Sequence, residues 1–167
     1  MSDDLAQKID IIKGTEFDWF AVDSEGYVGH FSTAGSGLIP LLAIQNFEDY
    51  YSLMDFFSSK KGNYRSFLRA EIKSCYQTTL KSFVNKKPED AYLDWLNVAS
   101  FGIYSYDWPV NDNIPYEYYY SVTFSDDYIT IDNLPGDFNK IVSRICFKDI
   151  LFRDFDEINP ANFFECM

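Results

Sequence analysis

Two short apolar runs near the amino terminus form the first clear pattern in the chain. Residues 17–22 are mostly aromatic and aliphatic, and a second run extends from Tyr27 to Phe31. The residues between the two runs are polar or small and end in Gly26. Glycine readily adopts the positive φ of a tight turn, so the pattern predicts a β-hairpin. The small residues 32–37, followed by Pro40, predict a loop.

Four later segments carry apolar residues three and four positions apart, the spacing of one helix face. The first predicted helix begins near Asn46, and the second covers residues 64–84. The third starts at Pro88, and the fourth follows residues 134–136. The expected inward face of the first consists of Phe47, Tyr51, Met54 and either Phe57 or Ser58.

The period changes to two in residues 116–124, which predicts a half-buried strand. Its even positions are aromatic or aliphatic, which places Glu117 and Tyr119 on the predicted outward face. Residues 128–131 are expected to pair with it as a hairpin.

Paired strands with helices between them indicate an α+β fold. We expect an antiparallel sheet built from hairpins and covered by about four helices, in one layered domain spanning residues 1–167. Residues 1–12 are expected to be an amino-terminal segment or helix, and residues 158–167 a loosely ordered tail.

The chain shows neither a signal-peptide pattern nor an apolar run long enough to cross a membrane, so we expect a cytoplasmic protein without membrane association. Its three cysteines, Cys75, Cys146 and Cys166, are far apart and odd in number. They are expected to be reduced thiols, two in the core and one on the tail.

The net charge of the chain limits the kinds of molecule that the protein is expected to bind. The chain has 26 Asp and Glu against 14 Lys and Arg, a formal net charge of -12. Proteins bind nucleic-acid backbones with cations that release counterions, so direct nucleic-acid binding is not expected.

The negative charge is concentrated in residues 88–139, which contain ten Asp and Glu, no Lys or Arg, and eight of the 13 tyrosines. Such a segment could be a solvated acidic face, but tyrosine is enriched where protein surfaces meet. We therefore expect a basic protein partner. The predicted partner-binding residues are Tyr104, Tyr106, Asp107, Asp112, Tyr116, Glu117, Tyr119, Asp126 and Asp127.

No pattern of residues predicts a catalytic, cofactor or metal site. His30 is the only histidine and lies at the end of a predicted strand, where a structural role is expected. The alternative is a metal-dependent enzyme in which carboxylates hold Mg²⁺, either Asp126 with Asp127 or a tail cluster. The tail cluster consists of Asp154, Asp156 and Glu157.

Two segments carry a resemblance to a known group. Residues 17–37 read FDWFAVDSEGYVGHFSTAGSG, with Pro40 soon after, and residues 99–107 read ASFGIYSYD. They resemble the W-F-A-x-D-x-x-G, G-x-G-x-x-P and A-x-x-G-[LI]-[YF]-x-[YF]-D motifs of bacterial immunity proteins from contact-dependent and polymorphic toxin systems. Leu134 and Pro135 before the last helix are a third, looser similarity.

The resemblance implies a non-enzymatic protein that binds and neutralises a cognate toxin domain. Cytotoxic nucleases hold their substrates with basic surfaces, so an acidic inhibitor would suit such a toxin. Deaminases, ADP-ribosylating toxins and pore formers are alternative targets. A regulatory adaptor that mimics DNA with the same acidic surface is a further alternative.

Overall fold

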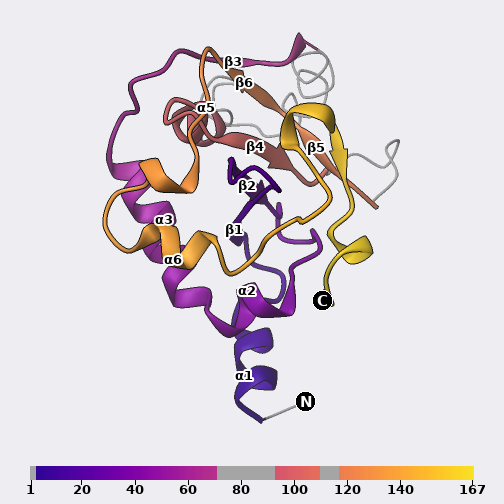
Figure 1. The fold of residues 1–167 in the computed structure, drawn as a ribbon. Helices are drawn as coiled ribbons and strands as arrows, with labels where there is room; N and C mark the ends of the chain where they lie inside the picture. The colour runs from indigo at the N-terminus through magenta and orange to yellow at the C-terminus, as the bar shows by residue number, and fades with distance from the viewer. Residues whose placement is uncertain (1–2, 71–92, 110–116) are drawn as a thin grey trace, which may run out of the picture.

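The computed structural model describes residues 3–70, 93–109 and 117–167. Within these ranges the fold is α+β, as expected, with a five-stranded sheet, a separate two-stranded sheet and helices packed around them (Figure 1). No helix in the described ranges is both long and apolar enough to span a membrane.

The predicted amino-terminal hairpin is confirmed. Strand β1 (Asp18–Val22) pairs antiparallel with β2 (Val28–Ser32), and Trp19 lies opposite Phe31. Gly26 closes the turn with a φ of 85°. The side chain of Trp19 stacks on Phe31, whereas Phe20 contacts Phe57 on the other side of the strand. The two faces of the hairpin therefore join different parts of the core.

The five-stranded sheet has the order β1-β2-β4-β5-β7 and is mixed. Strand β4 (Tyr104–Asp107) pairs parallel with β2 and antiparallel with β5 (Tyr119–Ser121), which pairs antiparallel with β7 (Glu157–Ile158). The expectation of a purely antiparallel sheet is therefore wrong. The chain between β2 and β4 is a long crossover containing helices, and such a connection can return a strand in the same direction.

The predicted strand over residues 116–124 is broken in two. Val122 separates β5 from β6 (Thr123–Ser125), which pairs antiparallel with β3 (Ser66–Leu68) in the second sheet. The helix predicted from residue 64 is therefore wrong over β3, while residues 71–84 lie outside the described ranges. The hairpin partner predicted at residues 128–131 is also wrong, because the described chain there forms an isolated bridge between Thr130 and Tyr27 and then a 3-10 turn at Ile131–Asn133.

Helices pack against strands β1 and β4 of the five-stranded sheet. Helix α1 (Asp3–Ile12) begins the described chain, and α2 (Leu41–Gln45) leads into α3 (Phe47–Ser59). The predicted helix near Asn46 is confirmed by α3, although its fully buried residues are Tyr50, Leu53 and Phe57, one position away from the expected Tyr51 and Met54.

The two remaining helices are short. Helix α5 (Leu93–Ala99) lies within the helix predicted from Pro88, whose first residues lie outside the described part of the chain, and it ends shortly before Gly102. Helix α6 (Phe138–Val142) confirms the last predicted helix. It packs beside α3 and β1, so the carboxyl-terminal third of the chain returns to the amino-terminal hairpin (Figure 1).

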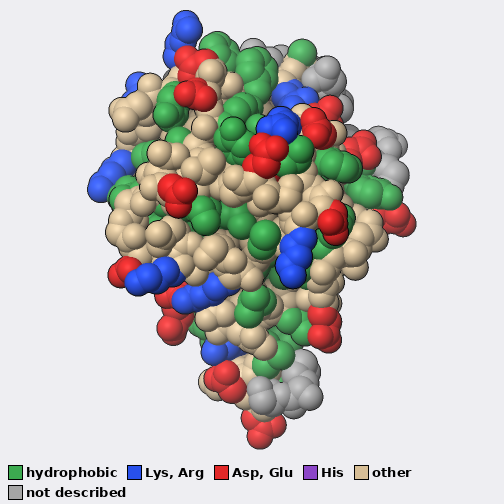
Figure 2. Space-filling model, viewed as in Figure 1, with side chains coloured by type: hydrophobic (Ala, Val, Ile, Leu, Met, Phe, Trp, Pro, Cys, Tyr) green, Lys and Arg blue, Asp and Glu red, His purple; other side chains and the backbone are tan. Residues whose placement is uncertain are grey.

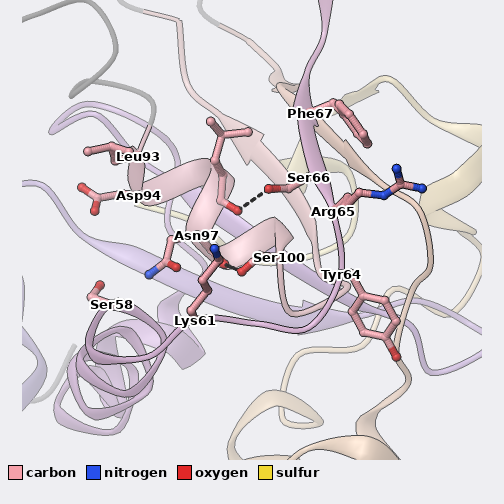
Figure 3. Close-up of a pocket in the computed structure, with 11 residues that line it drawn as sticks. Ser58, Lys61, Tyr64, Arg65, Ser66, Phe67, Leu93, Asp94, Asn97 and Ser100 are labelled. Carbon is pink, nitrogen blue, oxygen red and sulfur yellow. Dashed lines mark hydrogen bonds between the residues drawn. The ribbon is translucent and has the colours of Figure 1, made fainter.

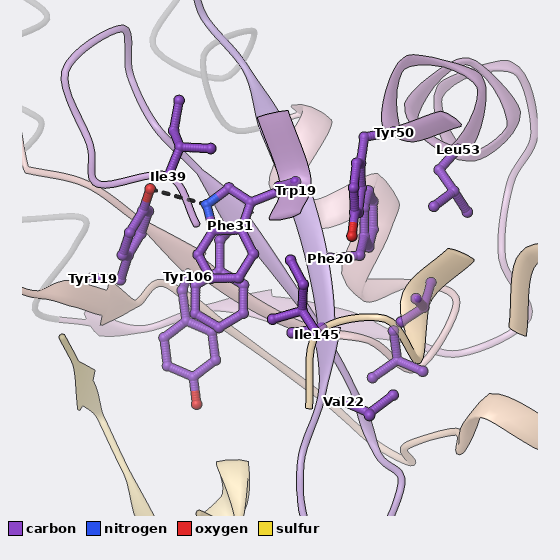
Figure 4. Close-up of a cluster of buried hydrophobic side chains, with 14 of the residues drawn as sticks. Trp19, Phe20, Val22, Phe31, Ile39, Tyr50, Leu53, Tyr106, Tyr119 and Ile145 are labelled. Carbon is purple, nitrogen blue, oxygen red and sulfur yellow. Dashed lines mark hydrogen bonds between the residues drawn. The ribbon is translucent and has the colours of Figure 1, made fainter. Parts of the chain in front are cut away.

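One face of the five-stranded sheet carries an aromatic core. Phe31 stacks between Trp19 and Tyr106, with ring centroids 4.1 Å and 5.0 Å away, and Tyr119 meets it edge-on (Figure 4). Phe152 covers the same ring. Aromatic rings supply large buried areas and add edge and stacking interactions, so this layer is a main source of stability.

The carboxyl-terminal residues are attached to this core. The backbone N–H of Met167 donates to the carbonyl of Ile39, and the N–H of Ile39 donates in return. Phe164 meets Phe147 edge-on with centroids 4.8 Å apart. Residues 158–167, which we expected to be loosely ordered, therefore have specific partners in the loop before α2 and at Phe147.

The opposite face of the sheet carries apolar residues toward one end of β1 and β2 and polar residues toward the other end. Phe20 and Val28 lie beneath the helices and are buried, while Asp18, His30 and Ser105 add polar groups to the same face. Buried polar groups are costly unless they are paired, so this part of the sheet is the first place to look for a site.

Candidate functional site

Four of the nine predicted partner-binding residues are buried. Tyr106 and Tyr119 have no exposed area, and Tyr104 and Asp107 are nearly as enclosed. A partner cannot reach these side chains in this structure, so they are removed from any interface. The predicted outward orientation of Tyr119 is wrong.

Tyr106 and Tyr119 are core residues whose hydroxyls are hydrogen-bonded. The Tyr106 hydroxyl donates toward the carbonyls of Phe152 and Phe155, at 3.0 Å and 2.9 Å. The Tyr119 hydroxyl donates to the carbonyl of Leu38 at 2.8 Å and accepts from Trp19 Nε1 at 3.2 Å. Burial raises the pKa of both phenols well above their usual value. A tyrosine side chain has an apolar ring and a polar hydroxyl at its tip. The alternation of polar and apolar residues in residues 116–124 therefore did not show whether Tyr119 would face the core or the solvent.

Among the described residues, the remaining predicted ones do not form one patch. Glu117, Asp126 and Asp127 are exposed, whereas Asp112 and Tyr116 lie outside the described residues. Glu117 precedes β5 and Asp126 follows β6, so they lie at opposite ends of one extended run (Figure 1). Asp126 accepts from Arg65 Nε at 3.2 Å, which reduces its availability to a partner.

The two-stranded sheet presents an exposed aromatic pair that the sequence did not indicate. Phe67 and Phe124 are opposite each other on β3 and β6, stacked with centroids 5.2 Å apart, and remain 42% and 45% exposed. Figure 2 shows hydrophobic side chains gathered over this end of the molecule, with acidic and basic side chains beside them. Sequence reasoning placed Phe67 within a helix and Phe124 inward.

A groove of about 590 Å³ runs beside this pair, between β3 and α5 (Figure 3). Phe67 and Leu93 contribute apolar walls, and Leu93 is also among the exposed large hydrophobic residues. Its charged lining consists of two cations, Lys61 and Arg65, and one carboxylate, Asp94. The wall is held together by Ser66, whose hydroxyl donates to the carbonyl of Leu96 at 2.8 Å.

On the other side of α5 lies a smaller acidic pocket of about 270 Å³. Asp94 lines both the groove and this pocket, so the two cavities are neighbours. The described residues that line the acidic pocket are Glu16, Asp18, His30, Ser32, Met54, Asp94 and Trp95.

His30 is the most deeply buried polar residue among those described in the acidic pocket, with only 1% of its surface exposed. Its Nδ1 lies 3.1 Å from Ser105 Oγ, and its Nε2 lies 3.2 Å from Asp18 Oδ1 without the alignment of a hydrogen bond. The row of serine, histidine and aspartate has the residue types of a hydrolase triad. Ser105 is completely buried, however, so no carbonyl could reach its hydroxyl, and nucleophilic catalysis does not follow from this geometry.

The tail carboxylates considered for a metal do not come together. Across the described ranges, no group of three or more His, Cys, Asp or Glu is arranged to hold a metal ion. Asp156 instead pairs with Arg69 at 2.8 Å. Among the thiols, burial raises the pKa of Cys166 to about 11, which keeps it protonated at neutral pH. Cys75 lies outside the described residues.

The motif residues of the amino-terminal segment have structural roles. The Asp23 carboxylate accepts three backbone N–H groups, from Glu25, Tyr27 and Phe152, at 2.9–3.0 Å. Gly37 packs so closely that a Cβ would lie 2.6 Å from the Tyr119 hydroxyl. The residues of these motifs therefore stabilise the fold, and they do not identify a binding surface.

No protein-family model, curated protein or solved structure matches this chain. Its function is therefore inferred from its own surfaces and from the motif resemblance.

Proposed function

We propose that this protein is an immunity protein that binds and neutralises a cognate toxin domain, a basic nuclease-type toxin in particular. The motif resemblance supports the class. The surface differs from the tyrosine-rich one expected from the sequence. It consists of the exposed pair on β3 and β6, the adjacent groove and the acidic pocket, and we call it the β3–β6 surface.

The exposed Phe67–Phe124 pair carries this proposal. Two stacked rings that remain more than two-fifths exposed lose little by being covered and gain a large apolar contact when a partner excludes water. Aromatic residues are enriched in the centres of protein interfaces. Leu93 extends the apolar area along the groove.

The net charge of the chain indicates the sign of the partner's charge. A net charge of -12 attracts a basic protein and repels nucleic acid. A nuclease domain needs a cationic surface to hold its substrate, so an acidic inhibitor can be steered onto that surface.

The experiment is a binding titration against the domain encoded beside this gene, with variants of the aromatic pair. Phe67→Ala combined with Phe124→Ala should weaken binding about 30-fold or more, as expected for a hot-spot pair. Phe155→Ala is the matched control, because Phe155 is exposed to 42% but lies outside the β3–β6 surface, and its affinity should be unchanged. Equal affinities for the wild type and the double variant would reject this surface.

The proposal that this is an immunity protein is tested in cells with the product of the same neighbouring gene. Co-expression of the protein should restore growth to cells that produce the toxin domain. Capture of a housekeeping nucleic-acid-binding protein in its place would favour the DNA-mimicking adaptor. A rise in melting temperature with millimolar Mg²⁺ or Mn²⁺ would favour the metal-dependent enzyme.

A further inference from the structure

Strand β3 forms an edge of the two-stranded sheet. Among the described strands it pairs with β6 alone, and β6 lies between it and β4 (Figure 1). An edge strand presents backbone N–H and C=O groups that can pair with a further strand. The hydrogen bonds at the two ends of β3 show which of its residues present them.

The ladder between β3 and β6 fixes the direction of each backbone group. The Arg69 N–H donates to the Val122 carbonyl. The Asp126 N–H, directly after β6, donates to the Arg65 carbonyl. In an antiparallel pair, every second residue directs its N–H and C=O to the neighbouring strand. Arg65 and Arg69 therefore face β6, and so does Phe67, midway between them.

Ser66 and Leu68 consequently direct their backbone groups away from β6, to the open edge. Neither residue has a backbone hydrogen bond to another described residue on that side. Both are partly exposed, so the edge is in contact with solvent. Each residue offers one donor and one acceptor, and a further strand would pair with all of them.

The side chains of β3 leave the strand on two sides (Figure 3). The Ser66 hydroxyl donates to the Leu96 carbonyl, and Leu68 packs against the small apolar cluster beside α5, so the helix supports β3 in its extended form. Phe67 lies on the opposite side, stacked on Phe124. A strand added at the edge would place a side chain next to Phe67, and such cross-strand neighbours stabilise a sheet.

The groove beside β3 has room for an extended segment. Its volume of about 590 Å³ lies within the range of ~300–1,000 Å³ typical of ligand pockets. Ser66 and Phe67 line one side of it, and Leu93, which is 55% exposed, supplies an apolar wall across from them (Figure 3). The groove therefore adjoins the open edge and can hold side chains of an added strand.

The backbone groups and the net charge select the occupant. Donors and acceptors at every second residue are complementary to an extended polypeptide. In the groove, Arg65 is already paired with Asp126, and Lys61 and Asp94 balance each other in charge. The net charge of -12 therefore decides the preference. It disfavours a second copy of this chain and favours a basic partner.

We propose that the edge of β3 binds an extended polypeptide by strand addition, and that in the complex this strand is a segment of the toxin domain. The second part rests on the proposed function. The added strand pairs with the backbone groups of Ser66 and Leu68 and places an apolar side chain against Phe67.

The edge is tested first without the toxin domain, by titrating the peptide acetyl-Lys-Val-Thr-Val-Thr-Val-Lys-amide into the protein. We expect a saturable NMR shift of the Ser66 and Leu68 amide signals with a millimolar dissociation constant. The same peptide with N-methyl groups on its central residues is the control, because it cannot donate to a strand, and it should bind at least about tenfold more weakly. No binding, or equal binding of both peptides, would overturn the site.

Amide hydrogen exchange tests the edge in the complex with the domain encoded beside this gene. In the free protein the Ser66 and Leu68 amides should exchange faster than the Phe67 amide, which the ladder protects. In the complex their exchange should slow by about tenfold or more, since each amide gains an acceptor. Unchanged exchange of both amides in a saturated complex would overturn strand addition.

Ser66→Pro removes one outward N–H and leaves the bonds to β6 in place. Ser66→Ala is the matched control, because it loses the same hydroxyl but keeps the N–H. Ser66→Pro should bind the toxin domain about tenfold more weakly than Ser66→Ala. A protected Phe67 amide in Ser66→Pro verifies that the ladder is intact. Equal affinities of the two variants would reject the edge contact.

The two proposals fail separately. If the peptide binds but the toxin domain does not, the strand-binding edge stands and the immunity function is rejected. If the toxin domain binds while the Ser66 and Leu68 amides stay unprotected, the immunity function stands and strand addition is rejected. Shifts of the same amides with protein concentration alone would assign the edge to a second copy of the chain and overturn the toxin segment as its occupant.

Discussion

At the scale of single residues, Asp23 has the most concentrated structural role. It is buried, and its carboxylate closes the amino-terminal turn and also accepts from Phe152, far along the chain. Asp23→Ala would leave three N–H groups without their acceptor, and we expect the free energy of unfolding to fall by about 3 kcal/mol or more. Urea unfolding measures the loss.

Ser24→Ala is the control for that variant, because Ser24 occupies the same turn with an exposed side chain. Its stability should remain within about 0.5 kcal/mol of the wild type. A similar loss in both variants would show that the turn itself, and not the Asp23 carboxylate, determines stability.

The Tyr119 hydroxyl allows a second prediction at this scale. Tyr119→Phe removes one oxygen and leaves Trp19 Nε1 and the Leu38 carbonyl unsatisfied in the core. We expect a loss of about 1–3 kcal/mol in the free energy of unfolding. The exposed Tyr51 is the matched site, and Tyr51→Phe should change stability little. A neutral Tyr119→Phe would contradict the role given to this hydrogen-bonded pair.

At the scale of elements, the sequence predicted those parts whose signal is local. The hairpin of β1 and β2, α3 and α6 follow from turn residues and periodic apolar positions. Strand β3 was missed, because three residues are too few to show a period and the apolar spacing continues into residues 71–84. The division of β5 from β6 at Val122 depends on two different partner strands, which no local pattern contains.

The candidate site was predicted less well for the same reason. The acidic composition is read directly from the sequence, and the class of partner stays a prediction. Three of the tyrosines expected at the surface, Tyr104, Tyr106 and Tyr119, form part of the core. The acidic pocket brings together residues from β1, β2, α3 and α5, and only the tertiary fold places them side by side.

The carboxyl-terminal segment provides a prediction at the scale of an element. Because Met167 and Ile39 exchange backbone hydrogen bonds and Phe164 packs on Phe147, deletion of residues 163–167 should lower stability by about 2 kcal/mol or more. The Met167 amide should also be protected in hydrogen exchange. Exchange of that amide at the rate of an unstructured chain would show that the tail is loose after all.

At the scale of the whole molecule, the buried tyrosines predict a steep loss of stability in alkali. Burial raises the pKa of Tyr50, Tyr106 and Tyr119 in the folded state, whereas in the unfolded chain they titrate near their usual value of about 10. Stability is therefore complete below about pH 10 and is lost above it, because the unfolded state releases protons that the folded state retains.

Each such tyrosine should remove about 1.4 kcal/mol of stability per pH unit above that point. Urea unfolding at a series of pH values measures the slope, and tyrosinate absorbance should appear for these rings only as the protein unfolds. Tyrosinate formation by all 13 tyrosines in a still folded protein would contradict their burial.

The net charge makes a prediction about association with a basic toxin domain. Raising the salt concentration from about 50 mM to about 500 mM shortens the screening length, so the association rate constant should fall by about tenfold or more. The dissociation rate should change much less, because the apolar contacts of the β3–β6 surface are not screened. A rate constant for association that is independent of salt would contradict electrostatic steering.

The most direct test of the central claim is a titration of toxin activity with this protein. The domain encoded beside this gene, which the proposal takes to be the toxin, is purified and held at a fixed concentration. Its nuclease activity is measured while the protein is added in increasing amounts. The account predicts that activity disappears at one equivalent of wild-type protein and survives one equivalent of the Phe67→Ala and Phe124→Ala double variant. Full toxin activity in the presence of excess wild-type protein would contradict it.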